Sequence, residues 1–155
     1  DGVFTDGKIL ITVNGDQLRT ANVKDGYALQ LARKNGYRIA VISGGKSPSM
    51  YNRLNSLGIT DVFLGVEHKI DVFEKYLNDN DLDPGSVIYM GDDIPDYHVM
   101  KRAAVPVCPA DAAEEIKSIS KYISHFEGGK GCVRDIIEQV LKLQNNWMDD
   151  DAFKW

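Results

Sequence analysis

The sequence changes from apolar to acidic within Val87-Ile88-Tyr89-Met90-Gly91-Asp92-Asp93-Ile94-Pro95-Asp96. The residues 87–90 are apolar and rich in β-formers, so they predict a strand buried on both faces, as in a parallel sheet. Asp92 then stands at the carboxyl end of that strand, where open α/β sheets bind ligands. Adjacent acids point in divergent directions, so we expect one of the pair to face the crevice, and the other, with Asp96, to support it. Carboxylate oxygens placed this way favour Mg²⁺, although an isolated Asp-Asp pair is more often a solvated loop.

Composition limits the classes of function. With 155 residues and 43% hydrophobic content, the chain is expected to form one domain, and no apolar run approaches the length of a membrane span. A net charge of -5 without a basic block argues against nucleic acid or an anionic membrane as partner. The two cysteines, Cys108 and Cys132, and the absence of a signal peptide from the printed sequence favour a reduced, cytoplasmic setting.

Strands and helices alternate along the chain after an initial hairpin. The hairpin is expected over 8–21, because Asn14-Gly15 is a pair favoured in type I′ turns. Expected strands cover 38–43, 61–64, 87–90, 105–108 and a short segment near 122, and expected helices cover 25–35, 48–58, 69–78, 95–102, a segment from 112, and 132–143. This order implies a Rossmann-like α/β fold, with a mainly parallel sheet and helices on both faces. A single domain would span 1–145, and the tail 146–155, which has no periodicity, is expected to be loose.

Small and acidic residues follow several of the expected strands. The first segment, if Asp1 is itself the end of a strand, is Asp1-Gly2-Val3-Phe4-Thr5-Asp6-Gly7, and the others are Ser43-Gly44-Gly45-Lys46-Ser47 and Asp92-Asp93. A parallel sheet would bring all three to one edge. In the second segment a hydroxyl, backbone N–H groups at a helix start and the Lys46 charge can hold a phosphate oxygen. Gly-Gly before a helix is also ordinary turn chemistry. Lys69 is unfavourably placed for the dipole of the helix it opens, which is consistent with a phosphate-neutralising role, and a solvated lysine is the alternative.

These segments, together with Lys69 and Asp96, resemble in their order the four motifs of haloacid-dehalogenase-type phosphatases. The hairpin, Lys24-Asp25-Gly26-Tyr27, Gly65-Val66-Glu67-His68-Lys69 and Gly128-Gly129-Lys130-Gly131-Cys132-Val133-Arg134 resemble its capless 3-deoxy-D-manno-octulosonate 8-phosphate phosphatase branch. The likeness covers roughly residues 1–143. It implies a protruding β-hairpin in place of a cap domain and assembly as a homotetramer. It also implies that the glycine-rich segment 128–131 reaches toward a neighbouring subunit's site.

The resemblance implies a phosphatase mechanism with Mg²⁺ as cofactor and a small acidic sugar phosphate as substrate. The substrate would be 3-deoxy-D-manno-octulosonate 8-phosphate or a related nonulosonate 9-phosphate. One aspartate attacks phosphorus, and a second protonates the leaving sugar oxygen and later activates water. The matching residues are Asp1 as the acid/base and, through its carbonyl, a metal ligand; Asp92 as the other metal ligand; Asp93 and Asp96 as supporting acids; Ser43 and Lys69 as catalytic phosphate-binding groups; and Gly44, Lys46 and Arg134 as further substrate contacts.

Two positions depart from the pattern of that family. The nucleophilic aspartate is expected two residues before Asp1, and the printed sequence contains neither it nor most of the central first strand. We expect the native chain to carry both, because a sheet without its central strand leaves backbone groups unpaired. Gly45 stands where the branch commonly has an arginine thought to help read the sugar acid. The resemblance therefore supports phosphatase chemistry more directly than it supports a particular sugar acid as the substrate.

Three other classes of protein share some of these features. A P-loop kinase is suggested by Gly45-Lys46-Ser47, but its pattern needs a glycine where Ala40 stands. A receiver-type signalling domain also uses an acid pair, a hydroxyl and a lysine, but there the acid pair comes early in the chain. The third alternative is a catalytically silent sugar-phosphate-binding or assembly subunit, which the missing nucleophile suggests.

Overall fold

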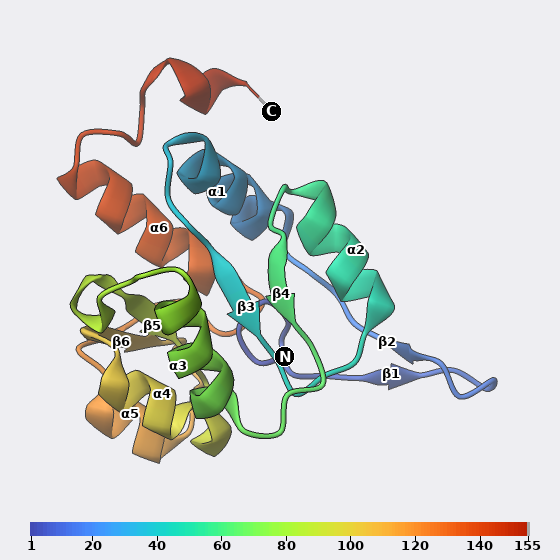
Figure 1. Ribbon diagram of the computed structural model, residues 1–155. Helices are drawn as coiled ribbons and strands as arrows, with labels where there is room; N and C mark the ends of the chain where they lie inside the picture. Colours follow the sequence, from blue (N-terminus) through green and yellow to red (C-terminus); the bar gives the residue numbers. More distant parts are fainter. Residues whose placement is uncertain (155) are drawn as a thin grey trace.

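Five short parallel strands form the centre of residues 1–154, the part of the chain that the computed structural model describes (Figure 1). They are β3 (Ala40–Ile42), β4 (Asp61–Phe63), β5 (Ile88–Met90), β6 (Val105–Cys108) and β7 (Tyr122–Ile123). β3 pairs with β4, while β5, β6 and β7 form a separate sheet with β6 in the middle. All three pairings are parallel, as the alternation of strands and helices predicts.

The predicted parallel sheet is observed as two groups of paired strands, and its central first strand is the one expected to be absent from the printed sequence. In the described residues β3 and β5 do not pair, and a groove of about 480 Å³ lies between them, lined by apolar side chains of both strands and of α1, α3 and α6. Ala40 and Ile88 line this groove and are exposed, Ile88 by 41%. The strand 87–90, which is predicted to be buried on both faces, is therefore open at Ile88, where it borders the groove.

Helices cover both sides of the two sheets, as predicted. They are α1 (Val23–Lys34), α2 (Pro48–Ser56), α3 (Lys69–Asp79), α4 (Tyr97–Arg102), α5 (Glu114–Ile119) and α6 (Cys132–Leu143). Leu29, Leu54 and Val133 join α1, α2 and α6 in one apolar cluster. Phe73 and Val99 join α3 and α4 in another, and α5 packs beside α4. Figure 1 shows the same division, with α1, α2 and α6 away from the group of α3, α4 and α5.

Local caps determine where two of the helices begin. The Ser47 hydroxyl accepts a hydrogen bond from the Met50 backbone N–H at 3.4 Å, so Ser47 caps α2 as predicted. α1 begins two residues earlier than expected, because Asn22 caps it instead. Asp25 is thereby carried into the first turn of α1, where it is buried and its Oδ1 accepts the backbone N–H of Arg134 at 2.8 Å. This contact joins the start of α1 to the start of α6.

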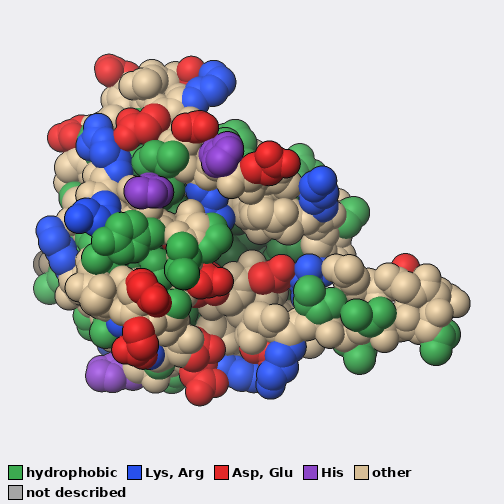
Figure 2. Space-filling model, turned by 90° about the horizontal axis from the view of Figure 1, so that it is seen from below, with side chains coloured by type: hydrophobic (Ala, Val, Ile, Leu, Met, Phe, Trp, Pro, Cys, Tyr) green, Lys and Arg blue, Asp and Glu red, His purple; other side chains and the backbone are tan. Residues whose placement is uncertain are grey.

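The hairpin formed by β1 (Leu10–Ile11) and β2 (Gln17–Leu18) projects from the body of the molecule (Figure 2). The Gly15 N–H donates to the Thr12 carbonyl at 2.9 Å, and Gly15 alone in this turn has a positive φ, of 85°. A type I′ turn requires positive φ at both central residues. The predicted turn type is therefore wrong, and the geometry is that of a type I turn followed by a left-handed glycine.

The C-terminal tail packs against the domain, in contrast to the loose segment expected from sequence. The Arg134 guanidinium lies 5.1 Å from the Trp147 ring centroid and 5.7 Å from that of Tyr27. The Tyr27 hydroxyl also donates to the Ala152 carbonyl at 2.5 Å, within a 3₁₀ turn at Asp150–Phe153. Individual side-chain contacts of this kind leave no periodic pattern in the sequence. In the described residues no helix is long and apolar enough to cross a membrane.

Candidate active site

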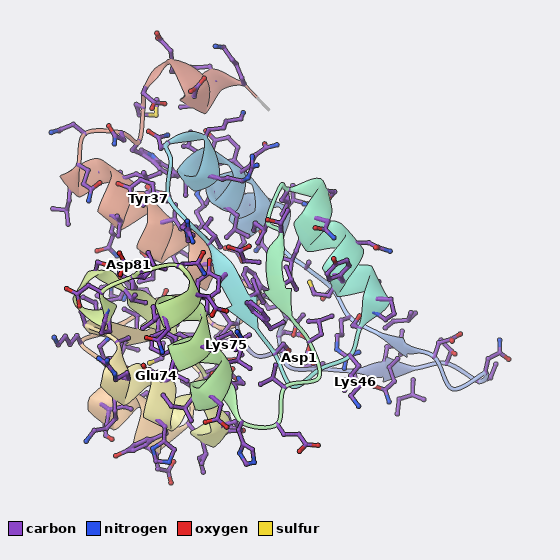
Figure 3. All side chains as sticks on the ribbon, viewed as in Figure 1. Asp1, Tyr37, Lys46, Glu74, Lys75 and Asp81 are labelled. Carbon is purple, nitrogen blue, oxygen red and sulfur yellow. The ribbon has the colours of Figure 1, made fainter. Side chains whose placement is uncertain are left out.

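The predicted acids, hydroxyl and lysine meet at a cavity of about 150 Å³ beside the carboxyl ends of β3 and β5. Asp1, Ser43, Lys69, Asp92 and Asp96 all line it, although they come from four separate segments of the chain. Figure 2 shows a hollow in this face with acidic and basic side chains around it, beside the base of the hairpin. In Figure 3 Asp1 lies at the same edge, below β3 and β4. The convergence predicted from the strand ends is thus observed.

Asp92 packs against the backbone at Asp1 and Gly2. A Cβ at Gly2 would lie only 1.8 Å from Asp92 Oδ2, and Gly2 has a φ of 74°, so only glycine fits here. The contact brings the Asp92 carboxylate to the main chain of the Asp1 loop. Gly2 therefore allows the two predicted metal ligands, a carboxylate and a backbone carbonyl, to approach the same place.

The electrostatics at Asp92 suit a cation. Burial, and next the neighbouring Asp96 carboxylate, raise the pKa of Asp92 to about 6, against the lowering effect of Lys69. A divalent cation beside Asp92 would offset this cost, because it stabilises the ionised carboxylate. Among residues 1–154 no cluster of three or more His, Cys, Asp or Glu side chains could hold a metal. The donors present, hard oxygens of Asp1 and Asp92, fit Mg²⁺ as part of its ligand set.

Asp96 is the centre of a buried polar network. It is 3% exposed, and its Oδ1 accepts from Lys69 Nζ at 2.7 Å and from the Tyr89 hydroxyl at 2.7 Å. Its Oδ2 accepts from the Asp92 backbone N–H at 3.4 Å. Burial and the Asp96 carboxylate together raise the pKa of the Tyr89 hydroxyl, which stays a donor. Asp96 thus orients Lys69 toward the cavity and accepts the backbone N–H of Asp92, while its predicted role as an acid that supports Asp92 stays a prediction. Tyr89 was not predicted as a site residue, because in the sequence it is one more member of an apolar strand.

The Asp1 carboxylate is held by two side chains. Thr5 Oγ1 donates to Oδ1 at 3.0 Å, and Arg19 Nε donates to Oδ1 and Oδ2 at 2.8 and 2.9 Å. Arg19 follows β2 at the base of the hairpin and lines the cavity. Sequence reasoning missed it, since one arginine in a hairpin is unremarkable until the hairpin is docked.

The loop after β3 presents Ser43 to the cavity. The Ser43 hydroxyl oxygen accepts the Gly45 N–H at 3.1 Å, and the loop is tied to the next strand by the Gly65 N–H, which donates to the Gly45 carbonyl at 3.0 Å. The N–H of Gly45, expected to serve phosphate, is therefore already engaged with Ser43. Lys46 does not line the cavity, and its aliphatic stem packs over Gly65. Figure 3 shows Lys46 at the same edge of the molecule as Asp1. The predicted contact between Lys46 and the substrate stays a prediction.

Three other predicted residues lie outside the cavity. Gly44 is next to Ser43 but does not line the cavity, and Asp93 uses Oδ1 to accept the Ile94 N–H at 2.8 Å, which supports the turn after Asp92. Arg134 lies over the Trp147 ring of the tail and the Tyr27 ring of α1, and it donates to Glu138 at 3.2 Å. It does not line the cavity of its own chain, and its predicted contact with substrate stays a prediction.

The glycine-rich segment before α6 packs on the Asp1 loop of its own chain. The Gly129 N–H donates to the Val3 carbonyl at 2.8 Å, and a Cβ at Gly128 would lie 2.0 Å from the Gly2 carbonyl oxygen. The absence of side chains at these positions therefore lets the segment brace the loop that carries Asp1. Its predicted reach toward a neighbouring subunit stays a prediction.

Comparison with known proteins gives consistent matches. A family model described as haloacid dehalogenase-like hydrolase matches residues 23–110. The 3-deoxy-D-manno-octulosonate 8-phosphate phosphatase of Salmonella typhi is 34% identical over 144 residues, which are 93% of this chain and 77% of the relative. The structure of the Yersinia pestis enzyme of that name superposes with a TM-score of 0.91 at 32% identity, over 94% of this chain and 79% of that one. The Moraxella catarrhalis structure, in complex with magnesium ion, phosphate ion and a KDO molecule, gives 0.92 at 31% identity, over 99% and 86%.

Proposed function

Because the chain belongs to the haloacid dehalogenase-like hydrolases, we propose that it is a Mg²⁺-dependent phosphatase of a small acidic sugar phosphate. The observation that carries the proposal is the meeting of Asp1, Ser43, Lys69 and Asp92 around one cavity. The names of its relatives support 3-deoxy-D-manno-octulosonate 8-phosphate as the substrate. The bound magnesium, phosphate and KDO of the Moraxella catarrhalis structure support the same substrate class and cofactor.

Five polar residues of the cavity have roles in this reaction. Asp92 and the Asp1 carbonyl would hold Mg²⁺, which supplies positive charge against the phosphate. The Ser43 hydroxyl and Lys69 Nζ hold phosphate oxygens, and Asp96 keeps Lys69 in place through their 2.7 Å ion pair. The Asp1 carboxyl group protonates the leaving sugar oxygen and then accepts a proton from the attacking water.

The reaction also needs a nucleophile. The groove between β3 and β5 could hold a strand that ends in the nucleophilic carboxylate. The groove shares Phe4, Ala40, Ile42, Tyr89 and Met90 with the catalytic cavity, so the two are continuous. The facing edges of β3 and β5 are both unpaired within residues 1–154. A parallel strand in this groove would satisfy both edges, and a carboxylate at its end would emerge into the cavity beside Asp1.

We further propose that the active unit is a homotetramer assembled through the hairpin. Ile9, Leu10, Ile11 and Val13 are exposed there, Leu10 and Ile11 by 67% each, and a two-stranded ribbon is not stable alone. Packing hairpins around a symmetry axis would bury these side chains. Replacing Ile9 and Ile11 by glutamate should give monomers with weakened catalysis in light scattering and turnover measurements, whereas Gln17→Glu should not. A wild-type protein that is fully active as a monomer contradicts this assembly.

The test of the phosphatase activity is phosphate release from the full-length protein. Turnover of sugar phosphates should require Mg²⁺, stop in excess chelator, and fall on the order of a hundredfold or more in Asp92→Asn. Asp93→Asn is the matched control, because it removes the adjacent carboxylate from outside the cavity. Full activity in chelator, or wild-type turnover by Asp92→Asn, would rule out the proposed mechanism.

A further inference from the structure

Arg19 is a largely buried cation at the base of an exposed hairpin. Its side chain is 11% exposed, whereas Leu18, immediately before it in β2, is 50% exposed. An arginine in a two-stranded ribbon normally extends into solvent, because its charge is costly to bury without a partner. The partner here is Asp1, across 18 residues of sequence.

The contact restrains both oxygens of the Asp1 carboxylate. Arg19 Nε lies 2.8 Å from Oδ1 and 2.9 Å from Oδ2, and Nη1 donates to the Gln17 carbonyl at 3.3 Å. Thr5 holds Oδ1 from another direction at 3.0 Å. Thr5 is 1% exposed, and its hydroxyl oxygen also accepts the N–H groups of Gly2 and Gly7 at 3.3 Å. Asp1 is therefore fixed between a rigid hydroxyl and a guanidinium anchored to the hairpin.

The restrained carboxylate faces the reacting part of the cavity. A Cβ at Gly45 would lie 3.4 Å from both Asp1 Oδ2 and Ser43 Oγ, so these two oxygens border the same space. The Asp1 side chain is itself 35% exposed, and without Arg19 only the Thr5 contact would oppose its rotation into solvent. A general acid acts only within hydrogen-bond reach of the leaving oxygen, and small misplacements cost large factors in rate.

We propose that Arg19 is a positioning residue that holds the Asp1 carboxyl group in line with the leaving oxygen of the substrate. The inference rests on the proposed phosphatase function and assigns to the hairpin a part in the chemistry of its own subunit. The comparison of two substrates below separates this role from a role in folding alone.

Two substrates with different leaving groups distinguish positioning of the acid from a role of Arg19 in folding or phosphate binding. A sugar alkoxide needs a proton to depart, whereas p-nitrophenolate departs without one. We therefore compare kcat/KM for 3-deoxy-D-manno-octulosonate 8-phosphate and for p-nitrophenyl phosphate in the full-length, Mg²⁺-loaded protein. kcat/KM includes only the steps up to departure of the leaving group, so later hydrolysis of the enzyme intermediate does not enter. Arg19→Gln should lower kcat/KM for the sugar phosphate by about 10- to 100-fold and that for p-nitrophenyl phosphate by less than about threefold.

A double-mutant cycle tests whether Arg19 acts through Asp1. Adding Arg19→Gln to Asp1→Asn should cause no further loss on the sugar phosphate, because the group to be positioned is gone. Arg19→Lys should fall between wild type and Arg19→Gln, since it keeps the charge but not the planar donor set. Lys24→Gln, which removes an exposed cation nearby, should match wild type on both substrates.

Several results would overturn the assignment. Equal losses on the two substrates would mean that Arg19 supports folding or phosphate binding. A raised KM for the sugar phosphate with unchanged kcat, persisting in Asp1→Asn, would mean that Arg19 binds the sugar acid itself. Both results require an active wild-type enzyme and leave the proposed function intact. A wild-type protein without sugar-phosphatase activity would overturn the proposed function and the role of Arg19 with it.

Discussion

Replacing Asp92 by asparagine should stabilise the metal-free protein at neutral pH while abolishing its activity. In the folded state the pKa of Asp92 is raised from 3.8 to about 6, first by burial and then by the Asp96 carboxylate. The pKa difference of about 2 units corresponds to about 3 kcal/mol of folding free energy, at 1.36 kcal/mol per pKa unit. Because Asp92 is partly accessible to solvent, we expect a smaller free-energy difference of about 2 kcal/mol. The raised pKa means that protonation favours the folded state. The stabilisation is therefore complete below about pH 4 and is lost as the pH rises through about 6.

The assay is urea unfolding of wild type and Asp92→Asn at pH 4 and pH 7.5, with chelator or with Mg²⁺. In chelator at pH 7.5 the variant should be more stable by about 2 kcal/mol, and the difference should shrink toward zero at pH 4. Mg²⁺ should stabilise wild type at pH 7.5 by mass action and leave the variant unchanged. Asp93→Asn is the control, because its exposed carboxylate caps the Ile94 N–H and does not line the cavity.

Two results would refute this reasoning. If Asp92→Asn were no more stable than wild type in chelator at pH 7.5, the burial of an ionised Asp92 would carry no cost. If Mg²⁺ stabilised the variant as much as wild type, the ion would bind elsewhere.

Two further substitutions test the parts of the site that hold Asp92 and Asp1 in place. Lys69→Met leaves the 3% exposed Asp96 carboxylate without its cation, so the free energy of unfolding should fall by about 3 kcal/mol. Adding Asp96→Asn should largely restore the free energy of unfolding. A loss under about 1 kcal/mol in urea unfolding would contradict the buried pair. Gly128→Ala puts a Cβ 2.0 Å from the Gly2 carbonyl oxygen and should cost about 1 to 3 kcal/mol and lower kcat. Gly36→Ala, at a φ of 83° with nothing within 4 Å, should cost about 1 kcal/mol without loss of kcat, and equal effects of the two would argue against the bracing contact.

Several residues of the site could be predicted from sequence because they directly follow the carboxyl ends of predicted strands. Alternating strands and helices imply parallel pairing, and parallel strands place their carboxyl ends on one edge. That rule was enough to bring Ser43 and Asp92 together, and the resemblance added the roles of Asp1 and Lys69. The α6 bounds, 132–143, were also predicted correctly, since that helix has a strongly one-sided apolar pattern.

The features that were missed depend on contacts between distant segments. Arg19 and Asp1 are 18 residues apart, and only the docked hairpin brings them together. The tail packs through Trp147 on Arg134, and a single stacked pair has no sequence period. The type I′ turn failed because Asn14-Gly15 is compatible with either turn, and hairpin length decides between them.

The most direct test of the proposed function is a phosphate-release competition among substrates with the full-length, Mg²⁺-loaded protein. 3-Deoxy-D-manno-octulosonate 8-phosphate and nonulosonate 9-phosphates are presented together with neutral hexose phosphates, and kcat/KM is measured for each. The account predicts that an acidic sugar phosphate has the highest kcat/KM and that the activity disappears in excess chelator. Faster turnover of the neutral hexose phosphates, or turnover that persists in chelator, would contradict it.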